Sequence, residues 1–258
     1  MATFLFDRII FGPVQSRRLG ASLGINLMPN DRKICTFDCI YCECGWTDPS
    51  GSSSVFHDRK EVYDGLRERL LSMKEHDEPL DTITFAGNGE PTMHPRFDLI
   101  IQDTLALRNQ IFPRAQIAVL SNASLIHKPK VFNALKKVDQ NILKLDSVFE
   151  TTLRRLNQPR GNFDLKRLID NLIAFQGDLI IQTLFVRATY NGFHIDNTTR
   201  EEVDAWLKVL EQIGPRQVMI YTIARDTPVE GMERLGYEDL RRIADRVEAL
   251  NIPVQISN

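Results

Sequence analysis

The four cysteines of the chain fall within ten residues, at Cys35, Cys39, Cys42 and Cys44. The first three follow a C-x3-C-x2-C spacing, and Tyr41 directly precedes the third. A segment this short has no room to pair three thiols in disulfides, whereas clustered thiolates are typical ligands of soft metals and iron–sulfur clusters. A closed structural zinc site needs four protein ligands. Three ligands leave one position free, so the spacing predicts a metal centre with an open coordination site.

Two other interpretations of these cysteines are open. They could be buried free thiols, which pack as small hydrophobic residues, but Lys33, Asp38 and Glu43 are polar neighbours for a core segment. Alternatively, Cys44 could be the fourth ligand of a zinc ion or of an electron-transfer cluster. Its distance from Cys42 argues against zinc, because zinc ligands are usually separated by two to four residues.

Composition bounds the class of protein. The 258 residues are 43% hydrophobic and 26% charged, which fits a globular protein with a sizeable core. The net charge of −2 gives no support to strong binding of nucleic acid or membranes. No apolar run of about 18 residues and no signal peptide is found. We expect a cytoplasmic protein without a membrane segment, folded as a single domain over residues 1–258.

Strand and helix patterns alternate along the chain. Apolar β-rich runs predict strands over 22–28, 82–86, 116–120, 141–145, 179–186 and 217–222, with a last short strand at 254–256. Helical periodicity is found over 60–74, 95–112, 129–137, 163–175, 199–213 and 237–250. Such alternation produces parallel strands with right-handed crossovers. A complete eight-unit barrel takes about 250 residues, so six units fit here. The predicted fold is α/β, a partial (β/α)6 barrel.

Two segments lie outside these units. Residues 1–21 are expected to form an N-terminal arm, with loop structure over 4–20 because glycine and proline set turns there. The adjacent Arg17 and Arg18 are either a solvated surface feature or a bidentate site for a carboxylate or phosphate. Residues 29–59 are expected to hold the cysteine loop and a flexible segment, and the polar stretch 44–57 is predicted to lie over the metal centre.

Polar side chains follow the predicted strands at the edge where parallel α/β folds place their active sites. Each has a structural alternative: a plain turn, a capped turn, an ion pair. The candidates for ligand binding are Gly87, Asn88, Gly89 and Glu90 after the second strand, Ser121 and Asn122 after the third, and Lys144 and Asp146 on the fourth. Later strands offer Gln182, Tyr221 and Arg225, which are equally consistent with a structural and a functional role.

The cysteine spacing, with an aromatic residue before the third cysteine, resembles the signature of the radical S-adenosylmethionine (SAM) superfamily. Segments 12–20, 85–92 and 182–186, together with the surroundings of Arg225, resemble the wyosine-synthase-related branch. The resemblance implies that Cys35, Cys39 and Cys42 hold a 4Fe–4S cluster whose fourth iron binds SAM. It also implies that Tyr41 lies near the adenine.

The same resemblance implies that Gly87–Glu90 corresponds to a Gly-Gly-Glu-type motif that holds the amino group of SAM, with Asn88 as a departure. Ser121, Asn122, Lys144 and Asp146 would add further SAM contacts. Reductive cleavage of SAM would give a 5′-deoxyadenosyl radical that abstracts hydrogen from an unidentified substrate. The implied activity is that of an oxidoreductase or transferase. Its electron donor would be a protein such as flavodoxin or ferredoxin.

Three alternatives compete with a radical SAM enzyme of unidentified substrate. One is an iron–sulfur electron-transfer or SAM-binding protein without radical catalysis, and another is a zinc-stabilised module. The third is tRNA modification, as in wyosine synthases. Archaeal enzymes of that type carry a second set of cysteines upstream, and residues 1–34 of this chain contain none. The net charge of −2 does not favour tRNA either.

Overall fold

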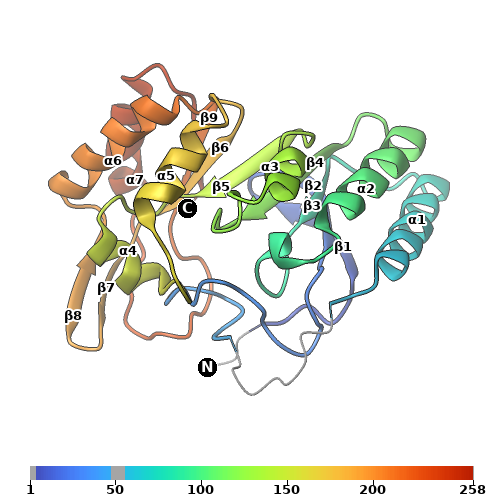
Figure 1. The fold of residues 1–258 in the computed structure, drawn as a ribbon, viewed down its shortest axis with the longest axis horizontal. Coiled ribbons are helices and arrows are strands. Elements are labelled where there is room, and N and C mark those ends of the chain that lie inside the picture. Colours follow the sequence, from blue (N-terminus) through green and yellow to red (C-terminus); the bar gives the residue numbers. More distant parts are fainter. Residues whose placement is uncertain (1–3, 48–55, 258) are drawn as a thin grey trace.

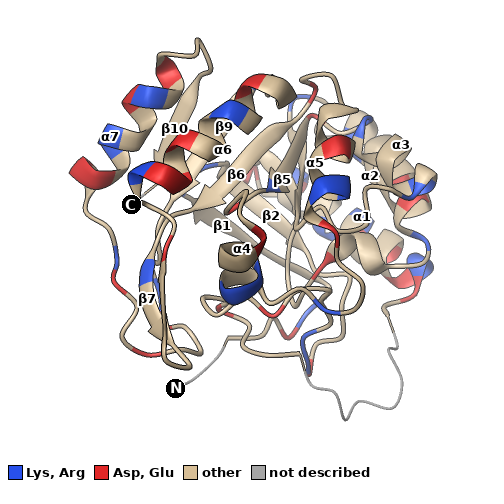
Figure 2. Ribbon diagram, turned by 60° about the vertical axis from the view of Figure 1, so that its left-hand side comes forward, with Lys and Arg blue, Asp and Glu red and all other residues tan. Residues whose placement is uncertain are grey.

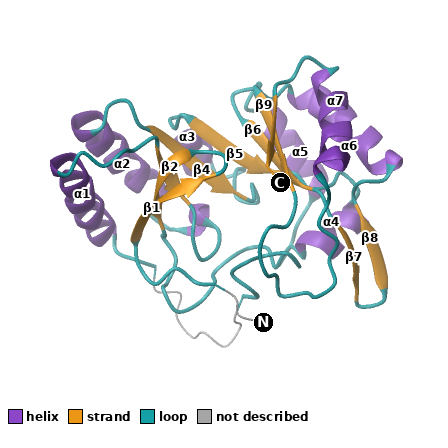
Figure 3. Cartoon of the chain, turned by 180° about the vertical axis from the view of Figure 1, so that it is seen from behind, coloured by secondary structure: helices purple, strands orange, loops and turns teal. Residues whose placement is uncertain are grey.

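The computed structural model describes residues 4–47 and 56–257. One eight-stranded sheet dominates this part, in the order β1-β2-β3-β4-β5-β6-β9-β10. All its neighbouring strands run parallel except β1, which is antiparallel to β2. The sheet curls, and helices lie along its outer side (Figures 1 and 3). This half-barrel confirms the predicted partial (β/α)6 fold.

The bounds of the elements agree closely with the predicted alternation. The strands are β1 (Ile10–Ser16), β2 (Gly20–Ile25), β3 (Thr82–Phe85), β4 (Gln116–Ser121), β5 (Gln140–Lys144), β6 (Ile180–Leu184), β7 (Arg187–Tyr190), β8 (Phe193–Asp196), β9 (Gln217–Tyr221) and β10 (Val254–Ser257). The helices are α1 (Arg59–Glu75), the short η1 (Pro91–Met93), α2 (Phe97–Ile111), α3 (Pro129–Leu135), α4 (Glu150–Asn157), α5 (Leu165–Ile173), α6 (Arg200–Ile213) and α7 (Tyr237–Glu248).

The main core lies between the sheet and its helices. Strands β3 and β6 are buried along their whole length, as expected of parallel strands covered on both faces. Helix α1 shows how a helix joins this core: Asp58 and Glu61 form a capping box at its start. Its buried side chains then recur every three or four residues, at Val62, Leu66, Leu70 and Met73. Charged residues lie mainly on the outward sides of the helices (Figure 2).

A small, separate cluster fills the inner side of the half-barrel. We call it the inner plug; its buried members are Leu19, Ala118, Ile142, Ile180 and Met219. Side chains two residues apart on a strand point to the same face. The next inward positions along β4, β5, β6 and β9, toward their carboxyl ends, are therefore Leu120, Lys144, Gln182 and Tyr221. The plug closes the bottom of the barrel and leaves these four side chains at its mouth.

The prediction of loop structure over residues 4–20 was wrong in part, because β1 occupies Ile10–Ser16. Its pairing with β2 is irregular between Phe11 and Val14, where Gly12 and Pro13 interrupt the ladder. Edge strands tolerate such an interruption. Glycine and proline thus concealed the strand in the sequence.

Four further elements were not predicted: η1, α4, β7 and β8. Helix α4 is a short helix of eight residues, and β7 and β8 form a hairpin outside the main sheet. The hairpin turns at Asn191 and Gly192, both with positive φ, which is a recognised two-residue hairpin signal. The predicted cover over the metal centre by residues 44–57 falls mostly on 48–55, outside the described residues. No helix in the described part is long and apolar enough to cross a membrane.

Candidate functional site

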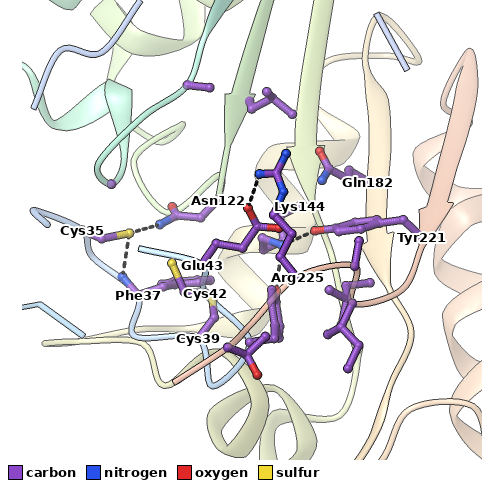
Figure 4. Close-up of a pocket in the computed structure, with 18 of the residues that line it drawn as sticks. Cys35, Phe37, Cys39, Cys42, Glu43, Asn122, Lys144, Gln182, Tyr221 and Arg225 are labelled. Carbon is purple, nitrogen blue, oxygen red and sulfur yellow. Dashed lines mark hydrogen bonds and ion pairs between the residues drawn. The ribbon is translucent and has the colours of Figure 1, made fainter. Parts of the chain in front are cut away.

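A pocket of about 310 Å³ opens at the carboxyl ends of the sheet strands (Figure 4). It brings together most of the predicted site residues, from the cysteine loop and from the ends of three strands, β3, β4 and β5. The predicted residues that line it are Cys35, Cys39, Tyr41, Cys42, Gly87, Gly89, Glu90, Ser121, Asn122 and Lys144. Asn88 and Asp146 do not line the pocket; both are buried directly behind it.

The cysteine loop is fixed on two sides. On one side Ile34 bridges to Gly89. On the other, the amide of Ile40 donates to the carbonyl of Leu156 at the end of α4 (3.0 Å), and Phe37 bridges to Pro159. The unpredicted helix α4 therefore has a clear role, since it carries the backbone that holds the middle of the loop.

Two of the cysteine sulfurs each accept a hydrogen bond from an asparagine side chain. Asn122 Nδ2 lies 3.5 Å from the sulfur of Cys35, and Asn157 Nδ2 lies 3.4 Å from the sulfur of Cys39. Burial raises the pKa of both thiols. By contrast, a hydrogen bond from Cys44 lowers the pKa of Cys42 to about 6. Coordination to a metal deprotonates a thiol outright, so burial does not prevent ligation.

Lys33 is the cation of the cysteine loop. Its ammonium donates to the carbonyl of Gly45 (2.8 Å) and pairs with Asp38 at 3.3 Å. Burial acts to lower its pKa, but the neighbouring thiols, first Cys42 and Cys35, raise it overall. A buried ammonium beside three thiols favours their thiolate forms. The sequence contained this residue, but only its tertiary position reveals the role.

The Gly87–Glu90 loop lies directly against the segment before Cys35. The amide of Ile34 donates to the carbonyl of Asn88 (2.9 Å), and the amide of Glu90 donates to the carbonyl of Ile34 (3.0 Å). Gly89 has φ +138°, and a Cβ there would lie 1.8 Å from the Ile34 oxygen. No other residue type fits this contact. Glycine is therefore required at position 89 for the Gly87–Glu90 loop to pack against the cysteine loop.

The side chain of Asn88 is structural. It accepts from the amide of Phe6 (2.8 Å) and donates to the carbonyls of Phe6 (2.9 Å) and Pro29 (2.8 Å). These bonds tie the N-terminal arm to the loop. Asn88 thus departs from a Gly-Gly-Glu-type motif without placing a side chain in the pocket.

Glu90 is fully buried and well satisfied. Its carboxylate accepts from Ser121 Oγ (2.8 Å) and from the backbone amides of Asn122 (2.7 Å) and Thr92 (3.1 Å). Burial raises the pKa of Glu90, while these donors act to lower it. Ser121 is therefore committed to Glu90. The Asn122 side chain is likewise committed, to Thr36 Oγ1 at 2.8 Å.

Lys144 and Asp146 point to the same face of their strand, as predicted, with 3.4 Å between Nζ and Oδ2. Asp146 also accepts from the hydroxyl of Tyr41 and from Asn157 Nδ2 (2.7 Å). Lys144 donates to the hydroxyls of Tyr41 (2.7 Å) and Tyr221 (3.2 Å). Burial acts to lower the pKa of Lys144, but Asp146 raises it overall. Lys144 and Asp146 thus form a buried ion pair, and Lys144 also lines the pocket.

The donor set fits a cluster better than a single ion. Among residues 4–47 and 56–257, no three His, Cys, Asp or Glu side chains are arranged to hold one metal ion. The thiols of Cys35, Cys39 and Cys42 nevertheless line one pocket. A 4Fe–4S cluster meets each thiolate at a separate iron, so its ligands need not converge on a point. Cys44 does not line the pocket, and its thiol faces the carbonyl of Gly87 at 3.5 Å.

For four pocket residues the sequence left the choice open between a structural and a functional role: Arg18, Gln182, Tyr221 and Arg225. Arg18 approaches from the turn between β1 and β2, and Tyr221 and Gln182 rise from the barrel interior. Arg225 forms an ion pair with Glu43 of the cysteine loop (2.7 Å). The alternation of inward side chains above the inner plug was a usable signal for Gln182 and Tyr221. Nothing local in the sequence pointed Arg18 toward the barrel.

The comparisons with known proteins agree with this geometry. The sequence profile of the radical SAM superfamily matches residues 32–186, so the chain belongs to that superfamily. Members of the superfamily use a 4Fe–4S cluster and SAM. The matched segment contains the cysteine loop, the Gly87–Glu90 loop and the Lys144–Asp146 pair.

Curated relatives are about 30% identical to the chain over the aligned segments. UPF0026 protein MJ1312 of Methanocaldococcus jannaschii is 32% identical over 84% of this chain and 64% of its own length. A UPF0026 protein of Helicobacter pylori is 29% identical over 84% of this chain and 67% of its own. A protein of Brachyspira hyodysenteriae named GTPase Obg is 29% identical over 96% of this chain. The chain spans only 34% of that last relative.

Solved structures share the fold at low identity. A radical SAM methyltransferase from Sphaerobacter thermophilus matches with a TM-score of 0.66 and 13% identity, over 92% of this chain and 65% of that one. Streptococcus suis SuiB bound to S-adenosylmethionine gives 0.63 and 16%, over 88% and 49%. TYW1 with a lysine-pyruvate adduct gives 0.60 and 15%, over 88% and 73%. At such identities the likeness shows the fold alone.

Proposed function

We propose that this protein is a radical SAM enzyme in which Cys35, Cys39 and Cys42 hold a 4Fe–4S cluster. The observation that carries the proposal is the bridge between Ile34 and Gly89, which joins the cysteine loop to the glycine loop at the wall of one pocket. When bound, the cluster and SAM would together supply a 5′-deoxyadenosyl radical that abstracts a hydrogen atom from the substrate.

The residues of the chain would position these groups. Gly87 and Gly89 line the pocket without side chains, because a Cβ would lie 2.4 Å from Asn26 Oδ1 at Gly87 and 1.8 Å from the Ile34 oxygen at Gly89. This loop would therefore meet a ligand with backbone groups. Glu90 would face the amino group of SAM. Lys33 would stabilise the thiolates, and its charge is already held beside them.

Tyr41, Lys144 and Asp146 would act through their shared network at the pocket wall. Tyr41 is locked between Lys144 and Asp146, so its ring is pre-oriented beside the cysteine loop. Ser121 and Asn122 would support SAM indirectly, since both hold neighbouring site residues in place.

The finer assignment is also a proposal. The resemblance of segments 12–20, 85–92 and 182–186 supports assignment to the branch related to wyosine synthases, and TYW1 shares the half-barrel. The net charge of −2 of the present chain gives no support to tRNA as the substrate. We propose an oxidoreductase or transferase of the cytoplasm, folded as one domain and reduced by a flavodoxin or ferredoxin.

The test is anaerobic reconstitution with iron and sulfide, followed by dithionite reduction and an assay for 5′-deoxyadenosine. Wild-type protein should bind about four irons and release 5′-deoxyadenosine from SAM. The Cys35→Ala variant should lose the cluster, whereas the matched Cys44→Ala variant should retain it. A fully loaded, reduced protein that leaves SAM intact would contradict the proposal. Loss of iron from Cys44→Ala, with an EPR signal that SAM does not change, would indicate an electron-transfer cluster with four cysteine ligands.

A further inference from the structure

Arg18 enters the barrel from below the pocket. Its backbone is fixed by Ser16 Oγ, which accepts from its amide (3.3 Å), and by Gln255 of β10, whose side chain donates to its carbonyl (3.3 Å). The guanidinium lies over the ring of Tyr221, with Cζ 4.9 Å from the ring centroid. The turn between β1 and β2 thus delivers a fixed cation to the pocket wall.

Among the described residues, this cation forms no ion pair; Glu43, which pairs with Arg225, acts on it only at longer range. Nη1 of Arg18 is buried without a hydrogen-bond partner, and no carboxylate in residues 4–47 or 56–257 forms an ion pair with the guanidinium. Three other cations that line the pocket are matched: Lys33 with Asp38, Lys144 with Asp146, and Arg225 with Glu43. Burying a charge without such a partner is costly. The arrangement is therefore one that an incoming anion would complete.

Arg18 lies on the side of the pocket away from the thiols. Its guanidinium covers the ring of Tyr221. Figure 4 shows Tyr221 and Gln182 across the pocket from Cys35, Cys39 and Cys42. The guanidinium is thus placed for a ligand beyond the cluster and SAM.

We propose that Arg18 receives an anionic group of the substrate, a carboxylate or a phosphate. This inference rests on the proposed radical SAM function, because it assigns the substrate side of the same pocket. A guanidinium fork binds either group bidentately, through two parallel N–H···O bonds. Lys144, Gln182 and Tyr221 stand at the inward positions around it and supply further donors.

The experiment measures binding of two small anions, inorganic phosphate and propionate, to the reconstituted protein in the presence of SAM. Calorimetry should give a dissociation constant for at least one of them with wild type. Arg18→Gln should weaken that binding about tenfold to a hundredfold, since a charge-assisted bond is lost. Arg18→Lys keeps the positive charge but not the two-pronged guanidinium, so its affinity for the anion should lie between those of wild type and Arg18→Gln. Arg17 also lines the pocket but is exposed, so Arg17→Gln makes the same charge change in water and should weaken binding less.

Several results would overturn the assignment. Absence of binding of both anions to wild-type protein that cleaves SAM would refute it and leave the radical SAM function standing. Binding of an anion without SAM cleavage would retain the anion site and reject the proposed function. Equal losses for Arg17→Gln and Arg18→Gln would indicate general charge rather than a site.

Two controls separate the remaining explanations. If Arg18→Gln weakens the binding of SAM as much as the binding of the anions, Arg18 binds the carboxylate of SAM itself and the assignment fails. The thermal midpoint of ligand-free Arg18→Gln should be no lower than that of wild type, because the variant removes a buried, unmatched charge. A clear drop would show a structural role with Tyr221 and refute the proposal.

Discussion

Replacement of Gly89 by alanine should disconnect the cysteine loop from the glycine loop. An alanine at φ +138° costs about 1–3 kcal/mol in backbone strain. Its Cβ would lie 1.8 Å from the Ile34 oxygen, so the two segments that form the bridge must separate. Loss of the two backbone hydrogen bonds there costs about 0.5–1.5 kcal/mol each. The sum is about 2–6 kcal/mol, a large share of the 5–15 kcal/mol typical of a domain.

Urea denaturation of the metal-free protein measures this loss, and iron content after reconstitution measures its effect on the site. Because Cys35 follows Ile34, Gly89→Ala should also retain less iron. The matched control is Gly192→Ala in the β7–β8 turn, where φ is +77° and nothing lies within 4 Å of the added Cβ. It should cost only about 1–2 kcal/mol. Equal destabilisation by the two variants, or full iron content in Gly89→Ala, would refute the reasoning.

Two further predictions concern buried carboxylates. Burial raises the pKa of Glu202, so its stabilising neutral form is fully present below the unfolded value of about 4.3 and is lost as pH rises through the folded value. Wild type should therefore lose stability relative to Glu202→Gln as pH rises from about 4. Urea titrations at several pH values measure this difference in the free energy of unfolding, and a difference that does not change with pH would contradict the prediction. Asp146→Asn leaves the buried Lys144 without its carboxylate and should lower the free energy of unfolding by about 3–5 kcal/mol. The same change at Asp170, in an exposed pair on α5, should have little effect, and equal losses would count against the buried ion pair.

The sequence predicted the half-barrel because its signals are local. Apolar runs and helical periods repeat over short windows, and their alternation restricts the topology to parallel strands. The errors occurred where local signals conflict. Strand β1 was missed because Gly12 and Pro13 interrupt it, and α4 because it is only eight residues long. Helix boundaries were close, since caps such as Asp58 are encoded in adjacent residues.

The candidate site was predicted in its composition but not in its contacts. Proximity of Cys35 to Glu90 followed from placing both at strand ends. That the Asn88 side chain binds Phe6, rather than a ligand, required the folded arm. Likewise, the commitment of Ser121 to Glu90 depends on two neighbouring strands meeting in register.

The sequence by itself determined the type of centre and the fold that carries it, because three cysteines at fixed gaps and a glycine loop impose their chemistry locally. Only the tertiary structure decided which charges face the pocket. Arg18 and Tyr221 lie far apart in the chain, and they meet because the sheet curls until the β1–β2 turn reaches β10. Curling sums small twists over eight strands, and no short window of sequence records that sum.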